Sequence, residues 1–410
     1  MAEAITCPFC GLACGDLVLS EAGVDTRGCA RAAAGFARAG APRRPHKIAN
    51  EPAGLEAAVS AAARILRGAS APLFHGLIAD LHAIRAVLAL AERVGGTVDH
   101  AYSPALLANT AVARASGWVT ATFAEVANHA DFILLVGADP QRNFPRFHER
   151  LVRNPTPLYR DGPPSLAYIG PDDLAPPAIL TGLRAIVGPT EVLDSVAALS
   201  LLTRGRRPGP AHTRLPIGAL TEIAGRLRGA RYGVIVWELS HCAPTTAELV
   251  VEYLADILRH LNARTRCVGL PLGGSGNALG ALQAALWQTG WPLPISFAGG
   301  RPEHDPWRHH GGRILGVGEA DAVVWVASSV PDPPPTSAAP VIGLLADDVD
   351  LATPAAVEIR VGIPGIDHGG EIVRADAVIA VPLQATRASD RPTAADAARA
   401  ILAAMEEPPC

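Results

Sequence analysis

The sequence is poor in aromatic residues, in methionine and in net charge. Of its 410 residues only 2 are methionine, aromatic side chains make up 5%, and the formal net charge is -4. A chain without an excess of basic residues has no field that attracts nucleic acid, so we expect no nucleic-acid partner. Hydrophobic residues at 49% and charged ones at 18% are typical of a compact globular chain with a sizeable core.

Long hydrophobic runs are also absent. No stretch reaches the roughly 18 uninterrupted apolar residues that a membrane-spanning helix needs. The first residues, MAEAITCPFC, lack the basic and apolar regions of a secretory signal. We therefore expect a cytoplasmic protein with no membrane partner.

Cysteine is rare over most of the chain and concentrated at its start. Of seven cysteines, Cys7, Cys10, Cys14 and Cys29 lie in the first 29 residues, and none lies between Cys29 and Cys242. The spacing Cys-x2-Cys-x3-Cys-x14-Cys allows four thiolates to converge on one centre, which suits an iron–sulfur cluster or zinc. We expect a metal site at these four cysteines, structural or vestigial, rather than a disulfide framework.

The rest of the sequence alternates short apolar runs with amphipathic helical patterns. This alternation predicts an α/β fold of Rossmann-like parallel sheets flanked by helices. Strands are predicted at 71–77, 131–137, 165–170, 232–239, 266–270 and 321–328, with further strands between 341 and 381. Helices are predicted at 80–94, 191–202, 246–261, 279–287 and 394–405.

Proline- and arginine-rich segments predict the domain boundaries, because proline cannot continue a helix. They are residues 41–47, 203–214 and 331–340. The predicted domains are a small cysteine-rich N-terminal subdomain (1–50), a first Rossmann-like unit (51–205), a second α/β unit (206–335) and a closing segment (336–410).

Three other clusters could carry chemistry. They are the segment with His304, Asp305, His309 and His310; the histidines His75, His82 and His100; and the loop Gly273-Gly274-Ser275-Gly276-Asn277. We favour a solvated or partner-facing loop for the first cluster and hydrogen-bonded core residues for the second. The glycine-rich loop lacks the lysine of a phosphate-binding loop and the full dinucleotide spacing. We therefore predict no catalytic and no cofactor-binding residues.

Several blocks of the sequence, in collinear order, resemble the beta (B-type) subunit of formylmethanofuran dehydrogenase. They are GWVTATFAEV from Gly117, NHADFIL from Asn128, GADP from Gly137, GSGN from Gly274 with TGWP from Thr289, and GIDHGG from Gly365. The resemblance covers nearly the whole chain. It implies a molybdopterin-oxidoreductase-like fold with an iron–sulfur ancestry for the cysteine-rich segment.

The chain departs from that family where its redox chemistry takes place. The family's metal-ligating cysteine or selenocysteine corresponds to about residues 99–109 (DHAYSPALLAN), which contain no cysteine. The arginine and histidine of the family's RGHYN segment fall on Gly273 and Ser275. A tungsten or molybdenum site needs a soft ligand and a polar surrounding, so the resemblance implies a lost redox site and no metallopterin.

Loss of the redox site on a retained scaffold most resembles the beta subunit of the bacterial formyltransferase/hydrolase complex. The resemblance implies conversion of formyl-tetrahydromethanopterin to formate through formyl-methylofuran in methylotrophic one-carbon metabolism. The partners would be an amidohydrolase-like alpha subunit, a formyltransferase and further subunits, with this chain as a structural member. Two alternatives are an active metallopterin-dependent formylmethanofuran dehydrogenase subunit and a free-standing Rossmann-like small-molecule binder.

Overall fold

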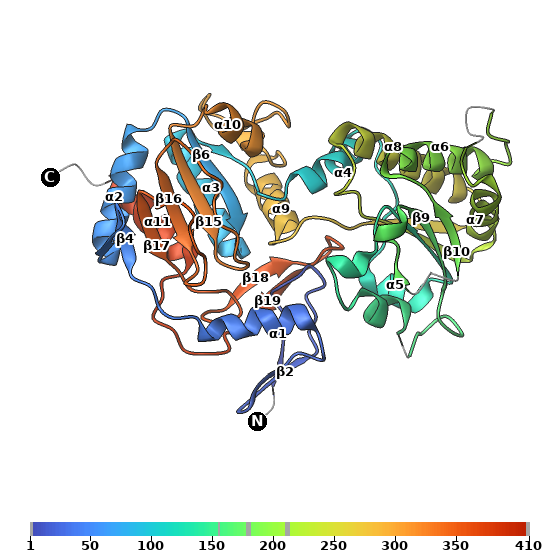
Figure 1. Cartoon of the computed structure of the whole chain (residues 1–410), viewed down its shortest axis with the longest axis horizontal. Coiled ribbons are helices and arrows are strands. Elements are labelled where there is room, and N and C mark those ends of the chain that lie inside the picture. The colour runs from blue at the N-terminus through green and yellow to red at the C-terminus, as the bar shows by residue number, and fades with distance from the viewer. Residues whose placement is uncertain (1–2, 155, 178–181, 210–213, 407–410) are drawn as a thin grey trace. The chain divides into compact units, whose positions relative to one another are not determined.

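The computed structural model describes residues 3–154, 156–177, 182–209 and 214–406. The chain forms two compact units, each built from discontinuous segments (Figure 1). Unit 1 consists of Met1–Ser103, Gly274–Arg374 and Ile379–Cys410, and unit 2 consists of Pro104–Gly273 and Ala375–Val378.

Unit 1 contains a nine-stranded sheet in the order β14-β13-β7-β6-β15-β16-β17-β4-β5. Its strands are β4 (His46–Ile48), β5 (Glu51–Ala53), β6 (Pro72–Ile78), β7 (Thr97–Val98), β13 (Ile295–Ser296), β14 (Glu303–His304), β15 (Ala322–Ala327), β16 (Val341–Leu345) and β17 (Val357–Arg360). The run from β7 to β17 is parallel, and the outer strands pair antiparallel. Every residue of β6 and β15 is buried, which explains their continuous apolar sequences.

Helices α2 (Leu55–Gly68), α3 (Leu81–Val94) and α11 (Ala394–Glu406) pack together and share one hydrophobic core with this sheet (Figure 1). Helix α3 ends at Gly95, whose φ of 68° is the left-handed conformation that favours glycine. The other helices of unit 1 are α1 (Ala30–Ala37), α9 (Ala278–Thr289) and α10 (Gly311–Val317). Two small antiparallel sheets complete the unit: β1 (Glu3–Ile5), β2 (Leu17–Ser20) and β3 (Gly23–Asp25), and β18 (Gly370–Val373) with β19 (Ala380–Leu383).

Unit 2 contains a five-stranded, wholly parallel sheet in the order β10-β9-β8-β11-β12. The strands are β8 (Phe132–Val136), β9 (Ser165–Gly170), β10 (Leu183–Ile186), β11 (Tyr232–Trp237) and β12 (Arg266–Pro271). The helices are α4 (Pro104–Ala115), α5 (Phe123–His129), α6 (Val192–Thr203), α7 (Ile217–Gly229) and α8 (Pro244–Leu261). Figure 1 shows α6, α7 and α8 together along β9 and β10, and their apolar side chains share one core with the sheet.

The α/β fold with parallel sheets and helices is confirmed, and the predicted strands and helices match observed ones with shifts of a few residues at their ends. The division into units differs from the predicted domain boundaries at 50, 205 and 335. Residues 46–53 form a hairpin at one edge of the nine-stranded sheet. The loop at 203–214, part of which lies outside the described residues, joins two helices of unit 2, and the loop at 331–340 joins two paired strands of unit 1. Proline-rich composition marks a chain reversal, but it cannot tell which elements the reversal connects.

In the ranges that the structure describes, no helix is both long enough and apolar enough to cross a membrane.

Candidate functional site

The four predicted metal ligands lie in the N-terminal segment of unit 1. Cys7, Cys10 and Cys14 lie in the loop between β1 and β2, and Cys29 directly precedes α1 as its N-cap residue. The loop closes on itself, because Cys7 N–H donates to the carbonyl of Cys14 (2.9 Å) and Ala13 N–H donates to that of Cys10 (3.1 Å). Cys7, Cys14 and Cys29 are buried, and Cys10 is half-buried.

The four thiols lie in one neighbourhood. Burial raises the pKa of the Cys7 thiol, and the other three cysteines raise it further, although a backbone hydrogen bond at Phe9 opposes the shift. Nevertheless, within the described part of the chain no three Cys, His, Asp or Glu side chains stand close enough to hold a metal ion together. Both observations fit thiols that are near one another but not drawn onto a common centre. A metal would have to displace their protons and pull them together, so the metal site stays a prediction.

The cysteine loop also packs against the rest of unit 1. The ring of Phe9 meets that of Phe36 edge-on at 5.0 Å, and it fills the space that a side chain at Gly35 would need. Pro8 lies against Gly365, where a Cβ would come within 2.8 Å of the proline ring. These contacts give the loop a packing role that does not depend on a metal.

The segment that would carry the metal-ligating thiol begins with a buried pair, Asp99 and His100. Asp99 accepts hydrogen bonds from two backbone N–H groups, each at 2.8 Å. His100 donates from Nε2 to the carbonyl of Gly276 (3.1 Å) and accepts at Nδ1 from the N–H of Tyr102 (3.0 Å). Burial lowers the pKa of His100 to about 3, so the neutral ring is the stable form. These residues offer no thiolate and use their polar atoms internally, so they do not fit a tungsten or molybdenum ion.

His75 and His82 complete the group of histidines that the sequence singles out. His75 is buried, and its Nδ1 donates to the carbonyl of Asp99 at 3.0 Å. Its ring meets that of Trp325 edge-on at 5.2 Å. His82 is exposed on α3. His75 and His100 are therefore hydrogen-bonded core residues, as predicted, and His82 is not.

The glycine-rich loop before α9 is held by Asn277. This residue has a φ of 64°, donates to the carbonyl of Ala79 (3.0 Å) and accepts from the N–H of Val373 (3.0 Å). Gly276 lies against Ile78, where a Cβ would come within 2.7 Å of the side chain. The loop thus ties the start of α9 to the end of β6 and to β18. Packing accounts for both the glycine and the asparagine.

The histidine-rich segment forms separate local contacts. His304 donates to the carbonyl of Pro294 (2.9 Å), and His310 caps α10 by accepting from the N–H of Arg313 (3.1 Å). Asp305 accepts from two backbone N–H groups of the following turn, each at 2.9 Å. These contacts stabilise the loop, in keeping with the favoured loop role.

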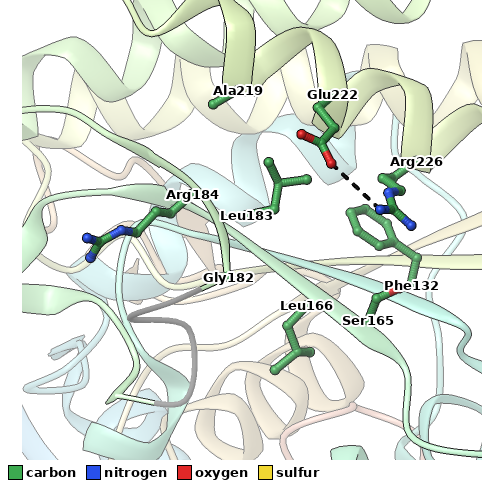
Figure 2. Close-up of a pocket in the computed structure, with 9 residues that line it drawn as sticks. All are labelled: Phe132, Ser165, Leu166, Gly182, Leu183, Arg184, Ala219, Glu222 and Arg226. Carbon is green, nitrogen blue, oxygen red and sulfur yellow. Dashed lines mark ion pairs between the residues drawn. The ribbon is translucent and has the colours of Figure 1, made fainter.

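Figure 2 shows a pocket of unit 2 at the amino ends of β8, β9 and β10, with a volume of about 620 Å³. Its lining residues are Phe132, Ser165, Leu166, Gly182, Leu183, Arg184, Ala219, Glu222 and Arg226. Glu222 and Arg226 form an ion pair at 3.6 Å, and both side chains are more than half exposed. Ligands of open parallel sheets bind beyond the carboxyl ends of the strands, so this pocket lies at the wrong end for a typical α/β site.

Residues that carry the family resemblance hold the framework of unit 2. Thr122 and Glu125 form a capping box at the start of α5, with hydrogen bonds of 3.0 and 2.8 Å. Asp376 accepts from the N–H of Phe123 (2.8 Å) at the same helix start. Asp131 accepts from two backbone N–H groups at the start of β11, at 2.8 and 3.1 Å. The retained positions therefore have clear structural tasks.

The comparison with known proteins agrees with the blocks seen in the sequence. The beta subunit of the formyltransferase/hydrolase complex (Fhc) of Methylorubrum extorquens is 32% identical to this chain over 337 residues, which cover 78% of this chain and 85% of the relative. The chain belongs to this beta-subunit family. The resemblance predicted from the sequence is thereby confirmed. No protein-family model matches the chain.

Two further relatives place this family within a wider group. The beta subunit of the tungsten-containing formylmethanofuran dehydrogenase 2 of Methanocaldococcus jannaschii is 26% identical over 415 residues, covering 95% of this chain and 94% of the relative. A crystal structure of the M. extorquens formyltransferase/hydrolase complex with methylofuran contains a similar chain. It matches with a TM-score of 0.75 and 29% identity, covering 88% of this chain and 98% of the other.

The sequence analysis gave no role to a group of basic residues in unit 2. His148 and Arg160 are both buried, although histidine and arginine are polar and arginine is rarely enclosed. The only signal in the sequence was the density of arginine between 142 and 160.

Proposed function

We propose that the chain is the structural, non-catalytic beta subunit of a formyltransferase/hydrolase complex. That complex would convert formyl-tetrahydromethanopterin to formate by way of formyl-methylofuran. One observation carries the proposal: where a redox relative needs a thiolate ligand, this chain has a buried Asp99–His100 pair that uses its hydrogen bonds internally. Membership of the beta-subunit family supports the same role.

The partners follow from the similar chain in the M. extorquens complex, which is named FhcABCD and was crystallised with methylofuran. We propose that this chain likewise assembles with an amidohydrolase-like alpha subunit, a formyltransferase subunit and further subunits. Formyl transfer and hydrolysis would take place on those partners. The similarity to a tungsten-containing dehydrogenase subunit supports a molybdopterin-oxidoreductase-like ancestry, with the cysteine-rich N-terminal subdomain as an inherited part.

For the cysteine-rich segment we propose a structural or vestigial metal site. Cys7, Cys10, Cys14 and Cys29 would hold an iron–sulfur cluster or zinc, since four thiolates suit either. The packing of Pro8 and Phe9 against the rest of unit 1 supports a structural purpose that survives without electron transfer.

The test is metal analysis of the complex purified without oxygen, together with an assay for formate. We expect neither tungsten nor molybdenum, and formate released from the formyl donor without an electron acceptor. Iron or zinc in amounts near one centre per chain would identify the occupant of the cysteine site. An acceptor-dependent reaction would contradict the proposed role.

The alternative is an active metallopterin-dependent formylmethanofuran dehydrogenase subunit. The observation in its favour is the alignment with the M. jannaschii tungsten-containing enzyme's beta subunit, which runs over 95% of this chain. It requires tungsten or molybdenum near one per chain in the same metal analysis.

A further inference from the structure

Unit 2 contains a second pocket, of about 660 Å³, that the proposed function does not use. It lies between the π-helical turn His148–Val152 and the start of β9. His148, Arg153 and Arg160 line it, and Asp161 is the one carboxylate on its wall among the residues that the structure describes. We call it the Arg160 pocket.

Arg160 is a buried cation without a partner of opposite charge. Its side chain is 7% exposed, and it donates to the carbonyls of Ala127 (3.2 Å), Val152 (3.1 Å) and Gly162. Its Nε–H is buried and has no acceptor. Burial lowers the pKa of Arg160, and no carboxylate in the described part of the chain offsets that shift. A buried, unpaired charge is costly, so an anion that reached this group would be bound favourably.

His148 adds a second buried group with unused hydrogen-bonding capacity. It is 4% exposed, and its Nε2 lies 3.7 Å from a carboxylate oxygen of Asp139, beyond hydrogen-bond distance. Burial lowers the pKa of His148; Asp139 opposes that shift and Arg153 adds to it, so the Arg153 guanidinium stands near the ring. Arg153 is exposed, which leaves it able to meet a ligand at the mouth of the pocket.

We propose that the Arg160 pocket binds a small oxyanion of the carboxylate or phosphate class. The Nε–H of Arg160 and the guanidinium of Arg153 supply the positive charge, and His148 supplies a neutral ring nitrogen. Planar guanidinium groups match the geometry of both anions and form strong, charge-assisted hydrogen bonds with them. The competing view is that Arg160 only braces the three carbonyls that it already meets, with no ligand at all.

The experiment is calorimetric titration of the full chain with sodium formate and with inorganic phosphate, at constant ionic strength held with sodium chloride. We expect saturable binding of one anion per chain. Arg153→Gln should weaken the dissociation constant by about tenfold, the effect of losing one charge-assisted hydrogen bond. Arg160→Lys keeps the charge but loses the Nε–H, so it should weaken binding as well.

The matched control is Arg207→Gln, which removes one exposed positive charge from the same unit outside the pocket. Its affinity should equal that of the unaltered chain. Because Arg153 and Arg207 are exposed, both variants should fold even where Arg160→Lys does not. Absence of saturable binding for both anions, or equal affinity in Arg153→Gln and Arg207→Gln, would overturn the proposal. The tighter of the two anions identifies whether a carboxylate or a phosphate is the occupant.

Discussion

At the scale of single residues, the role given to Asn277 leads to an unusual prediction for a glycine in a helix. Replacing Gly by Ala inside a helix normally stabilises it by about 0.5–1 kcal/mol. At Gly280 of α9, however, an added Cβ would overlap the side-chain oxygen of Asn277. That oxygen cannot move without losing its bond from Val373 and disturbing the bond to Ala79. We expect Gly280→Ala to lower the free energy of unfolding of unit 1 by about 2 kcal/mol.

The control for this prediction is Gly316→Ala in α10, also in unit 1. Gly316 is exposed, and nothing lies within 4 Å of the Cβ that the substitution would add. It should therefore leave stability unchanged or raise it slightly. Urea denaturation of both variants measures the difference, and equal stabilities would show that Asn277 does not hold the loop.

Also at the residue scale, His100 predicts a stability that depends on pH. Burial lowers the pKa of His100 to about 3, far below its ordinary value in an unfolded chain. The folded state therefore binds fewer protons than the unfolded state, and the stability is lost as pH falls from about 6.5 towards the folded pKa. We expect a loss of about 2–3 kcal/mol from this group between about pH 7 and pH 4.5. Denaturation curves at the two pH values test it: His100→Gln should lack this part of the pH dependence, and His82→Gln, which alters an exposed histidine, should retain it.

At the scale of elements, the loop between β1 and β2 predicts an order of thiol reactivity. Cys10 is half-buried, whereas Cys7, Cys14 and Cys29 are buried. Burial also raises the pKa of the Cys7 thiol, which keeps it protonated and unreactive. Iodoacetamide at about pH 8 should therefore modify Cys10 first and Cys7 much later. Peptide mass analysis over time measures the order, and Cys7 reacting first would contradict the packing of this loop.

The elements that could be predicted from the sequence are those whose signal is local. The runs at 131–137 and 165–170 are continuous apolar segments between turn residues, and both form buried strands of unit 2. The hairpin of β4 and β5 was missed because its strands have three residues each and are polar or half-buried. Strands of that kind exist only because a distant sheet edge pairs with them.

At the scale of the whole molecule, the division into units could not be predicted from composition. Unit 2 is formed by 104–273 with a four-residue return at 375–378, and no linear pattern announces that return. The candidate sites divide in the same way. The clustering of Cys7, Cys10 and Cys14 is visible in the sequence, whereas Arg160 becomes notable only once its burial and its missing carboxylate are known.

The last prediction concerns the assembled complex and separates a scaffold from a catalytic subunit. If the Asp99–His100 pair only stabilises unit 1, His100→Gln should reduce the amount of complex that assembles while formate release per assembled complex stays within about twofold. The reason is that substitution of a buried, hydrogen-bonded residue lowers stability, and lower stability reduces abundance without altering chemistry carried by partner subunits. Size-exclusion chromatography gives the assembled amount, and a formate assay on the isolated peak gives the turnover. His82→Gln should change neither quantity. A fully assembled His100→Gln complex without turnover would instead place His100 in the chemistry and return this chain to the catalytic subunits.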